Sequence, residues 1–337
     1  MKHTDRLIAV RGLSMSNQSS PEMSVIVVAA RYQTIRKTIR HLRTQTVKDR
    51  LEIVIVAPSR EQLGLSEVEL EDFLQFRVVE IGTIRSLGQA MAAGVRQACA
   101  SVAVFGEDHC YPEPGWAVAL IEAHRKGWDA VGPVMGNANP QSLTSWASFF
   151  AGLGRWTEPA IAGEIDDLPP HNSSYKRTML LDYGPALEAM LEVESLLHQD
   201  LRAKGHRLYW EPAAKVRHVS YTSLLSLMQA EFHYGRLFAA ARMRRWSLLR
   251  RLMYTIGGPL IPLVRLRRVL REIQRAGHQR QLLPGVFPAL IVILASNAVG
   301  EMCGYAFGAG NASQQRCTFD LDRYRHLAKR DRQVEAG

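Results

Sequence analysis

The sequence predicts an α/β protein with a mostly parallel, Rossmann-like sheet and flanking helices, followed by a helical C-terminal tail. Val- and Ile-rich runs of strand length show no polar alternation, and segments with apolar residues at helical spacing separate them. Strands that are covered on both faces have this pattern, because helices bury both sides of a parallel sheet. Beyond residue 220 the predicted elements are helices alone, which places a domain boundary there.

The first strand–helix unit begins at Ser24, with an apolar run over 25–30 and helical spacing over 34–45. Further strands are expected at 52–57, 77–81, 101–105 and 129–132, and helices at 86–98, 116–126 and 180–204, with a loop at 136–145. Ligands of parallel sheets bind beyond the carboxyl ends of the strands. The strand ends expected to bind a ligand are residues 29–31, 57–60 and 106–110.

Composition and predicted secondary structure change along the chain and divide the 337 residues into four segments: 1–22, 23–220, 221–315 and 316–337. The first is a polar, irregular extension without an apolar run long enough for a signal peptide, so we expect the α/β domain to lie in the cytosol. The last is a polar tail. An apolar content of 47% with 22% charged residues excludes general disorder.

The cysteines are scattered. They are Cys99, Cys110, Cys303 and Cys317. Their spacing suggests neither a disulfide framework nor a cysteine zinc site, and it fits a reducing compartment.

The net charge of +10 is concentrated in the third segment. Between Arg236 and Arg280 many arginines face the single acid Glu272, and apolar residues interleave with them. This pattern favours helices that lie on an anionic surface, and a solvated basic face remains an equal alternative. Residues 282–300 carry no charge and are nearly long enough to span a bilayer, although a re-entrant helix, an interface-lying helix or a buried hairpin also fits them.

An acidic cluster follows the expected strand at 101–105. Glu107, Asp108 and His109 stand in one turn that is closed by the sequence CYPEPGW. Carboxylates and an imidazole from one turn are able to hold Mg²⁺ or Mn²⁺, which would neutralise a departing diphosphate. A surface turn closed by Pro and Gly is the alternative explanation.

The order of these features resembles the family-2 glycosyltransferases of GT-A fold, over roughly residues 24–220. The resemblance rests on the ordered segments SVIVVAARYQTIRKTIRHLRTQT, LEIVIVAPSRE, SLGQAMAAGVRQACASVAVFGEDH, HNSSYKR and GHRLYWEPAAKVRH. Each segment is weakly specific alone, and together they occur in the order that the family has. Segments 231–236 and 300–305 look similar to the tails of membrane-associated bacterial members, and glycines 300, 304, 308 and 310 would allow close helix packing in or against lipid.

The resemblance implies a metal-dependent, inverting transfer of a sugar from a nucleotide-sugar donor to a lipid-linked or cell-surface glycan. It implies Glu194 as the general base, with Glu192 as the alternative, and a Mg²⁺ or Mn²⁺ ion held by Asp108, His109 and His218. The implied donor-binding residues are Ala29, Ala30, Arg31, Ala57, Arg85, Gly88, Glu107 and Asp108, and the acceptor-binding residues are Asn172, Tyr175 and Arg177. Residues 236–310 would hold the protein at the cytoplasmic face of the inner membrane, and no nucleic acid is expected.

The sequence departs from the family pattern in the donor pocket. Ala57 and Pro58 stand where the family has an Asp that contacts the base, and Met91 and Ala92 replace an Arg–Asn pair. Arg31, Arg60 or Arg85 would compensate as phosphate partners. Two other functions stay open: a non-catalytic relative that binds a nucleotide or glycan, and an adaptor for anionic membranes or nucleic acid.

Overall fold

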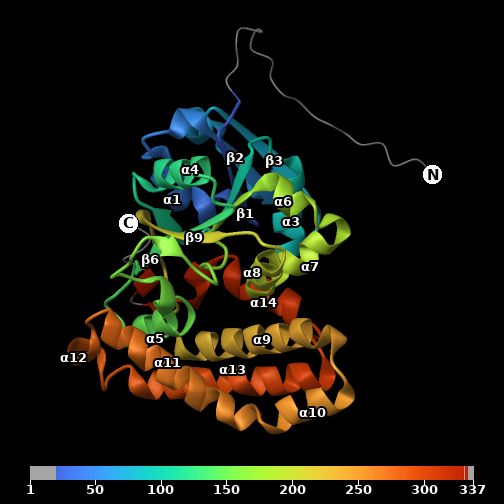
Figure 1. Ribbon diagram of the computed structural model, residues 1–337. Coiled ribbons are helices and arrows are strands. Elements are labelled where there is room, and N and C mark those ends of the chain that lie inside the picture. Colours follow the sequence, from blue (N-terminus) through green and yellow to red (C-terminus); the bar gives the residue numbers. More distant parts are fainter. Residues whose placement is uncertain (1–19, 330, 333–337) are drawn as a thin grey trace.

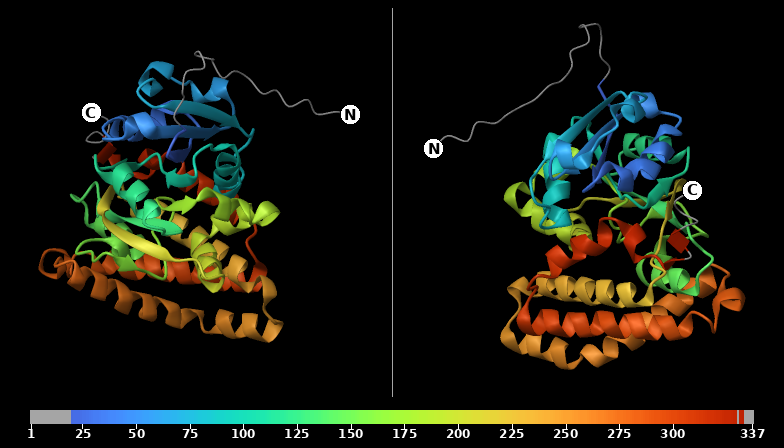
Figure 2. Two further views of the ribbon diagram at one scale, coloured as in Figure 1. Left: turned by 45° about the horizontal axis from the view of Figure 1, so that its top comes forward. Right: turned by 180° about the vertical axis from the view of Figure 1, so that it is seen from behind.

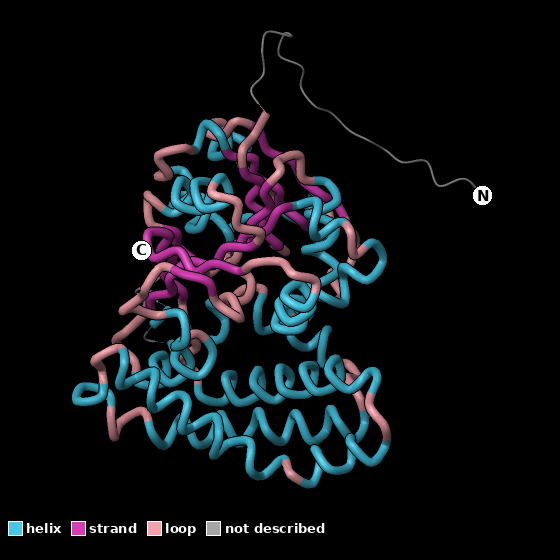
Figure 3. The backbone as a smooth tube through the Cα atoms, in the orientation of Figure 1, coloured by secondary structure: helices cyan, strands magenta, loops and turns pink. Residues whose placement is uncertain are grey.

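The computed structural model describes residues 20–329 and 331–332, so most of the segment 1–22 lies outside the described residues. Two layers make up the molecule: a sheet with its own helices, and a bundle of long helices beneath it (Figures 1 and 3). The strands are β1 Met23–Val28, β2 Leu51–Ala57, β3 Gln75–Glu80, β4 Val102–Gly106, β5 Cys110–Pro112, β6 Ala130–Asn137, β7 Gly163–Glu164, β8 Ser174–Lys176 and β9 Leu208–His218.

The helices of the sheet layer are α1 Tyr32–Arg43, α2 Arg60–Leu63, α3 Leu87–Gln97, α4 Trp116–Arg125, α5 Leu143–Gly152, α6 Arg177–Leu181, α7 Leu187–Glu192 and α8 Glu194–Ala203. Those that follow are α9 Leu224–Arg242, α10 Leu248–Ile256, α11 Ile261–Arg275, α12 Gln279–Leu282, α13 Phe287–Phe307 and α14 Ala312–Asp320. Short 3-10 turns are η1 Lys48–Arg50, η2 Glu67–Leu70, η3 Gly154–Trp156, η4 Gly184–Ala186, η5 Met243–Arg245, η6 Gly258–Leu260 and η7 Arg323–His326.

The strand order is β3-β2-β1-β4-β8-β6-β9-β5, with β7 paired to β9. Strands β3, β2, β1 and β4 are parallel, as predicted, whereas β8 and β5 run antiparallel to their neighbours and make the sheet mixed. The α/β class with flanking helices is therefore confirmed. The expected helix over 180–204 is divided into α6, α7 and α8, because Gly184–Ala186 forms a 3-10 turn and the backbone of Val193 is not helical (φ −138°, ψ 80°).

The central strands are buried on both faces, which explains their unbroken apolar sequence. In β1, Val25 and Val27 belong to the core on one side of the sheet, and Ile26 and Val28 to the core on the other side. Continuous side-chain packing on both faces fixes the register of β1 against β2 and β4. The carboxyl ends of these strands are thereby held at one edge of the sheet.

The helical layer is built around α9 and α13, which pack closely (Figure 1). A Cβ on Gly235 would overlap the carbonyl oxygen of Asn297, and one on Gly300 would overlap that of Phe232. The guanidinium of Arg265 pairs with the buried carboxylate of Glu301. Within the described residues, α13 is the one helix that is long and apolar enough to cross a membrane, and half of its most apolar stretch is buried in the protein.

The chain then returns to the sheet. Helix α14 and turn η7 lie between the helical layer and the strand ends, as the rear view makes clear (Figure 2). Cys317 and Phe319 of α14 enter the cores on the two sides of the sheet. Much of the segment 316–337, expected as a polar tail, is thus part of the folded domain.

Candidate functional site

The turn after β4 and the end of β9 meet at the edge of the sheet. Strand β5 follows this turn and pairs antiparallel with β9, so that Cys110 stands opposite His218. The rings of His109 and His218 make an edge contact, with their centroids 4.7 Å apart. The structure therefore brings the acidic turn and the distant histidine together, as the sequence predicts.

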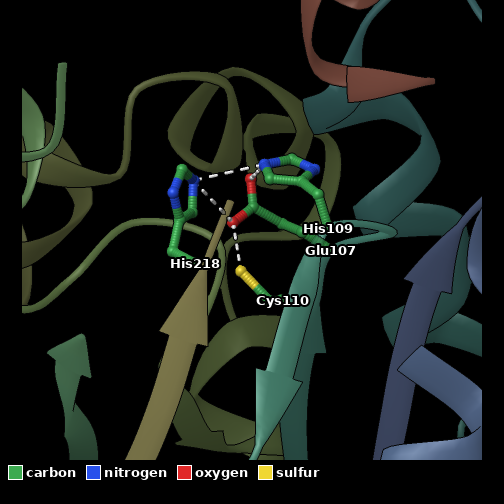
Figure 4. Close-up of side chains that lie close together, drawn as sticks. All are labelled: Glu107, His109, Cys110 and His218. Atoms are coloured by element: carbon green, nitrogen blue, oxygen red, sulfur yellow. Dashed lines mark hydrogen bonds and ion pairs between the residues drawn. The ribbon is translucent and has the colours of Figure 1, made fainter. Parts of the chain in front are cut away.

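Among the described residues, Glu107, His109, Cys110 and His218 each place one ligand atom within 4.8 Å of the others (Figure 4). The Nε2 atoms of His109 and His218 are 3.2 Å apart. The Sγ of Cys110 lies 3.2 Å from Oε2 of Glu107, to which Nδ2 of Asn172 also donates at 2.7 Å. We call these four residues the strand-end cluster.

Asp108, predicted as a direct or water-mediated metal ligand, faces other partners. Its Oδ1 lies 2.5 Å from Nδ1 of His109, and its Oδ2 accepts a hydrogen bond from the backbone N–H of Asp322 at 2.7 Å. Cys110 takes the fourth place in the cluster instead. The sequence analysis missed Cys110 because no second cysteine stands near it; its position beside an E-D-H turn is the signal that was available.

Burial controls the protonation of the cluster. It raises the pKa of the Glu107 carboxyl and that of the Asp108 carboxyl each to about 7. It also lowers the pKa of His109 and of His218 well below the usual value, with nearby Arg323 acting in the same direction. Both imidazoles are therefore neutral near pH 7, and each has one ring nitrogen that carries a lone pair.

The segment after α14 covers this cluster, and sequence reasoning did not foresee it. The guanidinium of Arg323 lies 3.1 Å from Nε2 of His109 and 3.2 Å from Oδ1 of Asp320, and its carbon is 3.8 Å from the ring centre of Tyr221. Its Nε and Nη1 are buried and have no hydrogen-bond partner among the described residues. Asp322, which has left-handed backbone (φ 66°), pairs with Arg31 at 3.2 Å.

The cleft at the strand ends is consequently small. A cavity of about 30 Å³ remains, with Val28, Met91, Phe105, Asp320 and Leu321 in its lining. That is room for one or two water molecules. Sites for organic ligands typically measure about 300–1,000 Å³.

Glu194, the predicted base, is buried next to His171, a residue that lines this cavity. Its Oε2 accepts from the backbone N–H of His171 at 2.6 Å, and Oε1 accepts from the hydroxyl of Tyr175 at 3.3 Å. Burial raises the pKa of Glu194 to about 8 against the opposing hydrogen bond from His171. The alternative base, Glu192, instead accepts from the backbone N–H of Gly88 at 2.7 Å.

The predicted donor-binding residues line the strand ends unequally. Ala29 and Ala57 are fully buried under the sheet edge, and Ala30 is half-buried beside them. Arg31 and Arg85 are exposed; Arg31 pairs with Asp322.

The predicted acceptor-binding residues are spread over the domain. Asn172 contacts the cluster through Glu107, whereas Tyr175 is buried in β8 and also bonds His198 at 2.8 Å. Arg177 donates to the carbonyl of Val95 at 2.9 Å, and its backbone N–H bonds Ser101, which precedes β4. Arg177 thus lies at the amino end of the strand, away from the cluster, because β8 runs antiparallel to β4.

The chain is similar to solved structures of glycosyltransferases. GalNAc-T7 with UDP, GalNAc and Mn²⁺ matches 60% of this chain at 15% identity and a TM-score of 0.48, and the chain spans 44% of GalNAc-T7. S. aureus TarS 1–349 in complex with UDP matches 84% of this chain and 90% of TarS 1–349, at 15% identity and a TM-score of 0.46. The same protein in complex with UDP-GlcNAc gives 14% identity and 0.44 over the same shares. At these values the matches identify no substrate.

No protein-family model and no curated protein matches the chain.

Proposed function

We propose that this protein is an inverting glycosyltransferase of GT-A type that uses a nucleotide-sugar donor. The observation that carries the proposal is the meeting of the Glu107–His109 turn with His218 at the carboxyl ends of parallel strands. Nucleotides bind at such edges, and polar groups from separate elements converge there on the phosphates. The ordered sequence segments that resemble the family supply the reaction class.

Glu194 is the proposed general base. In the transfer, it takes the proton of the acceptor hydroxyl while that oxygen bonds the anomeric carbon. The bond from this carbon to the diphosphate breaks on the opposite face, and the diphosphate leaves with the electron pair. Burial raises the pKa of Glu194 to about 8, which makes its carboxylate a stronger proton acceptor and means that it is ionised mainly above that pH. The backbone N–H of His171 and the hydroxyl of Tyr175 fix its orientation.

Arginines are the proposed partners of the departing diphosphate. Arg31 and Arg323 reach the strand ends from opposite ends of the chain, and guanidinium groups pair well with phosphate oxygens. The expected Mg²⁺ or Mn²⁺ ion fits the cluster poorly, since one of its four ligand atoms is an oxygen and these ions prefer oxygen ligands. The protein's own cations are therefore assigned to the diphosphate.

The proposal requires the cleft to open. A cavity of about 30 Å³ cannot hold a nucleotide sugar, and Asp320, Leu321 and Asp322 stand where the donor would enter. Donor binding thus displaces the segment between α14 and η7. The closed cleft also favours the second candidate function, a non-catalytic relative that binds without turnover.

The membrane is the proposed partner of the helical layer. Helices α10 and α11 and the turn η6 between them expose many large apolar side chains: Leu248, Leu249, Leu252, Met253, Ile256, Leu260, Leu263 and Val264. Exposed arginines, among them Arg250, Arg267 and Arg271, flank this face. A helix pair of this kind is suited to the interface of an anionic bilayer. It supports the proposal that the acceptor is a lipid-linked or cell-surface glycan and that the protein acts at the cytoplasmic face of the membrane.

Helix α13 supports attachment at the interface rather than a span. Its Asn297 donates to Glu231 of α9 at 2.7 Å and, with Glu301, binds Arg265. These polar groups face protein partners on two helices.

A flotation assay tests the apolar face of α10 and α11. Leu252→Asp lowers binding to anionic vesicles roughly tenfold or more, as expected when one leucine no longer enters the bilayer. Ile161→Asp, at a still more exposed site on a loop of the sheet layer, leaves the binding to vesicles unchanged.

The transferase is tested with Glu194→Gln. Purified protein is assayed for binding of several sugar nucleotides and for slow donor hydrolysis and transfer. Glu194→Gln should keep donor binding and lose transfer by about 10²–10⁴-fold. Glu188→Gln, an exposed acid on the neighbouring helix α7 that pairs with Arg96, is the control. Normal transfer by Glu194→Gln rules out Glu194 as the base, and binding without turnover by the wild type selects the second candidate.

A further inference from the structure

We propose that Glu107, His109, Cys110 and His218 form a tetrahedral site for a divalent ion of the Zn²⁺ class. The site lies at the edge of the proposed donor cleft, and the proposal stands without the transferase. It replaces the hard Mg²⁺ or Mn²⁺ ion that the sequence led us to expect.

The four ligand atoms are close enough to converge on one ion. Bonds of about 2.0–2.3 Å from Zn²⁺ to nitrogen, oxygen and sulfur put neighbouring ligand atoms roughly 3.3–3.6 Å apart. The Nε2 atoms of His109 and His218 are 3.2 Å apart, Sγ of Cys110 is 3.2 Å from Oε2 of Glu107, and Nε2 of His218 is 3.9 Å from the same oxygen. All four ligand atoms lie within 4.8 Å of one another, so binding of the ion draws the more distant pairs together.

The chemistry of the ligand atoms selects the ion. Two imidazoles and one thiol suit Zn²⁺ and its neighbours in the transition series, whereas Mg²⁺ keeps oxygen ligands and water. On binding, the Cys110 thiol gives its proton to solvent and the sulfur bonds the ion as thiolate.

The groups around the cluster are those that orient metal-bound histidines. Asp108 accepts from Nδ1 of His109, which leaves Nε2 of that ring as the ligand atom. Ser220 Oγ lies 3.5 Å from Nδ1 of His218, and Asn172 holds Glu107. Asp108 is therefore a positioning residue for the ion rather than one of its ligands.

Arg323 competes with the ion. Its Nη2 donates to the same His109 Nε2 lone pair that the ion would use, and a second cation beside a divalent ion is repelled. Metal binding therefore displaces Arg323 and the segment that carries it. Two of its guanidinium nitrogens lack partners among the described residues, which lowers the cost of this displacement.

Cobalt reports the site directly. The full chain is stripped with a chelator and titrated with Co²⁺, and Zn²⁺, Mn²⁺ and Mg²⁺ are then added as competitors. We expect one Co²⁺ per chain, the intense visible absorption of tetrahedral Co²⁺, and a near-ultraviolet thiolate-to-cobalt band. Zn²⁺ should abolish both signals and Mg²⁺ neither.

Variants assign the ligands. Cys110→Ser should lose the thiolate band, whereas Cys303→Ser, at a half-buried cysteine of α13, keeps it. Asp108→Asn should weaken Zn²⁺ binding about 10–100-fold, and His218→Gln at least as much. Arg323→Met should strengthen it. X-ray absorption of the Zn²⁺-loaded wild type, which needs no variant to fold, should give one sulfur in the first shell.

Weak octahedral absorption, an unaltered spectrum in Cys110→Ser, or a sulfur-free shell overturns the proposal. The two proposals fail separately. A tetrahedral cobalt spectrum without donor binding supports the metal site and contradicts the transferase. Donor binding that depends on Mg²⁺, together with an octahedral cobalt spectrum, supports the transferase and contradicts the metal site.

Discussion

The close contact between α9 and α13 gives the sharpest stability prediction. A Cβ on Gly300 would overlap the carbonyl oxygen of Phe232 and lie 2.8 Å from its carbonyl carbon. These atoms belong to a helix backbone and cannot rotate away as a side chain would. Gly300→Ala therefore forces the two helices apart.

The magnitude follows from two opposed effects. Overpacking of a tight core typically costs about 1–3 kcal/mol, and a rigid backbone neighbour puts this site at the upper end. Alanine gains up to roughly 1 kcal/mol over glycine within a helix. The net loss in the free energy of unfolding is about 1–2 kcal/mol.

Urea unfolding followed by circular dichroism measures this loss. The matched control is Gly152→Ala at the end of α5, where an added Cβ meets no atom of the described residues within 4 Å. Gly152→Ala should hold or raise stability. Equal stability of the two variants would show that α9 and α13 are not held at the separation that the structure shows.

Three further predictions concern other parts of the molecule. Burial lowers the pKa of His124 from 6.5 to about 4, so the unfolded chain binds a proton that the folded protein does not; stability is complete above the unfolded value and falls by roughly 3 kcal/mol as the pH drops to about 4. The free energy of unfolding should depend less steeply on pH between about 6.5 and 4 in His124→Gln than in the wild type. An unchanged slope would refute the lowered pKa of His124. Arg265→Met leaves the buried carboxylate of Glu301 without its cation and should cost about 3–5 kcal/mol, which the double variant with Glu301→Leu recovers; equal stability of single and double variants would argue against the pair. Asp322→Pro removes the N–H that Asp108 accepts and cannot adopt a positive φ, so hydrogen exchange across 312–327 should rise roughly tenfold or more. Asp322→Gly keeps the N–H and permits the positive φ, so its hydrogen exchange should equal that of the wild type. Faster exchange in both variants, or in neither, would contradict the hydrogen bond from Asp322 to Asp108.

Local pattern was enough to predict the sheet and one side of the site. Strands β1, β2 and β4 are continuous apolar runs, because both of their faces are covered. The placement of the Glu107 turn followed from the end of such a run. His218 was expected nearby through its surrounding segment, and the pairing of β5 with β9 explains why it is.

The covering of the site depends on contacts that span the chain and leave no local trace. Nothing in the residues around Arg323 indicates that it would stack on Tyr221, more than a hundred positions earlier. Cys110 joins the cluster through strand pairing, and Arg177 leaves it because the direction of β8 is reversed. Both outcomes follow from the strand pairing beyond β4, where the sequence predicted only the short strand at 129–132.

The position of Arg323 matters for how the protein is made. Residues 107–110 and His218 are synthesised before Arg323, and chains begin to fold while the ribosome is still adding residues. During that interval the imidazoles of His109 and His218 have no arginine beside them. Arg323 can cover the strand-end cluster only after synthesis has passed η7, close to the point at which Cys317 and Phe319 of α14 complete the cores of the sheet layer.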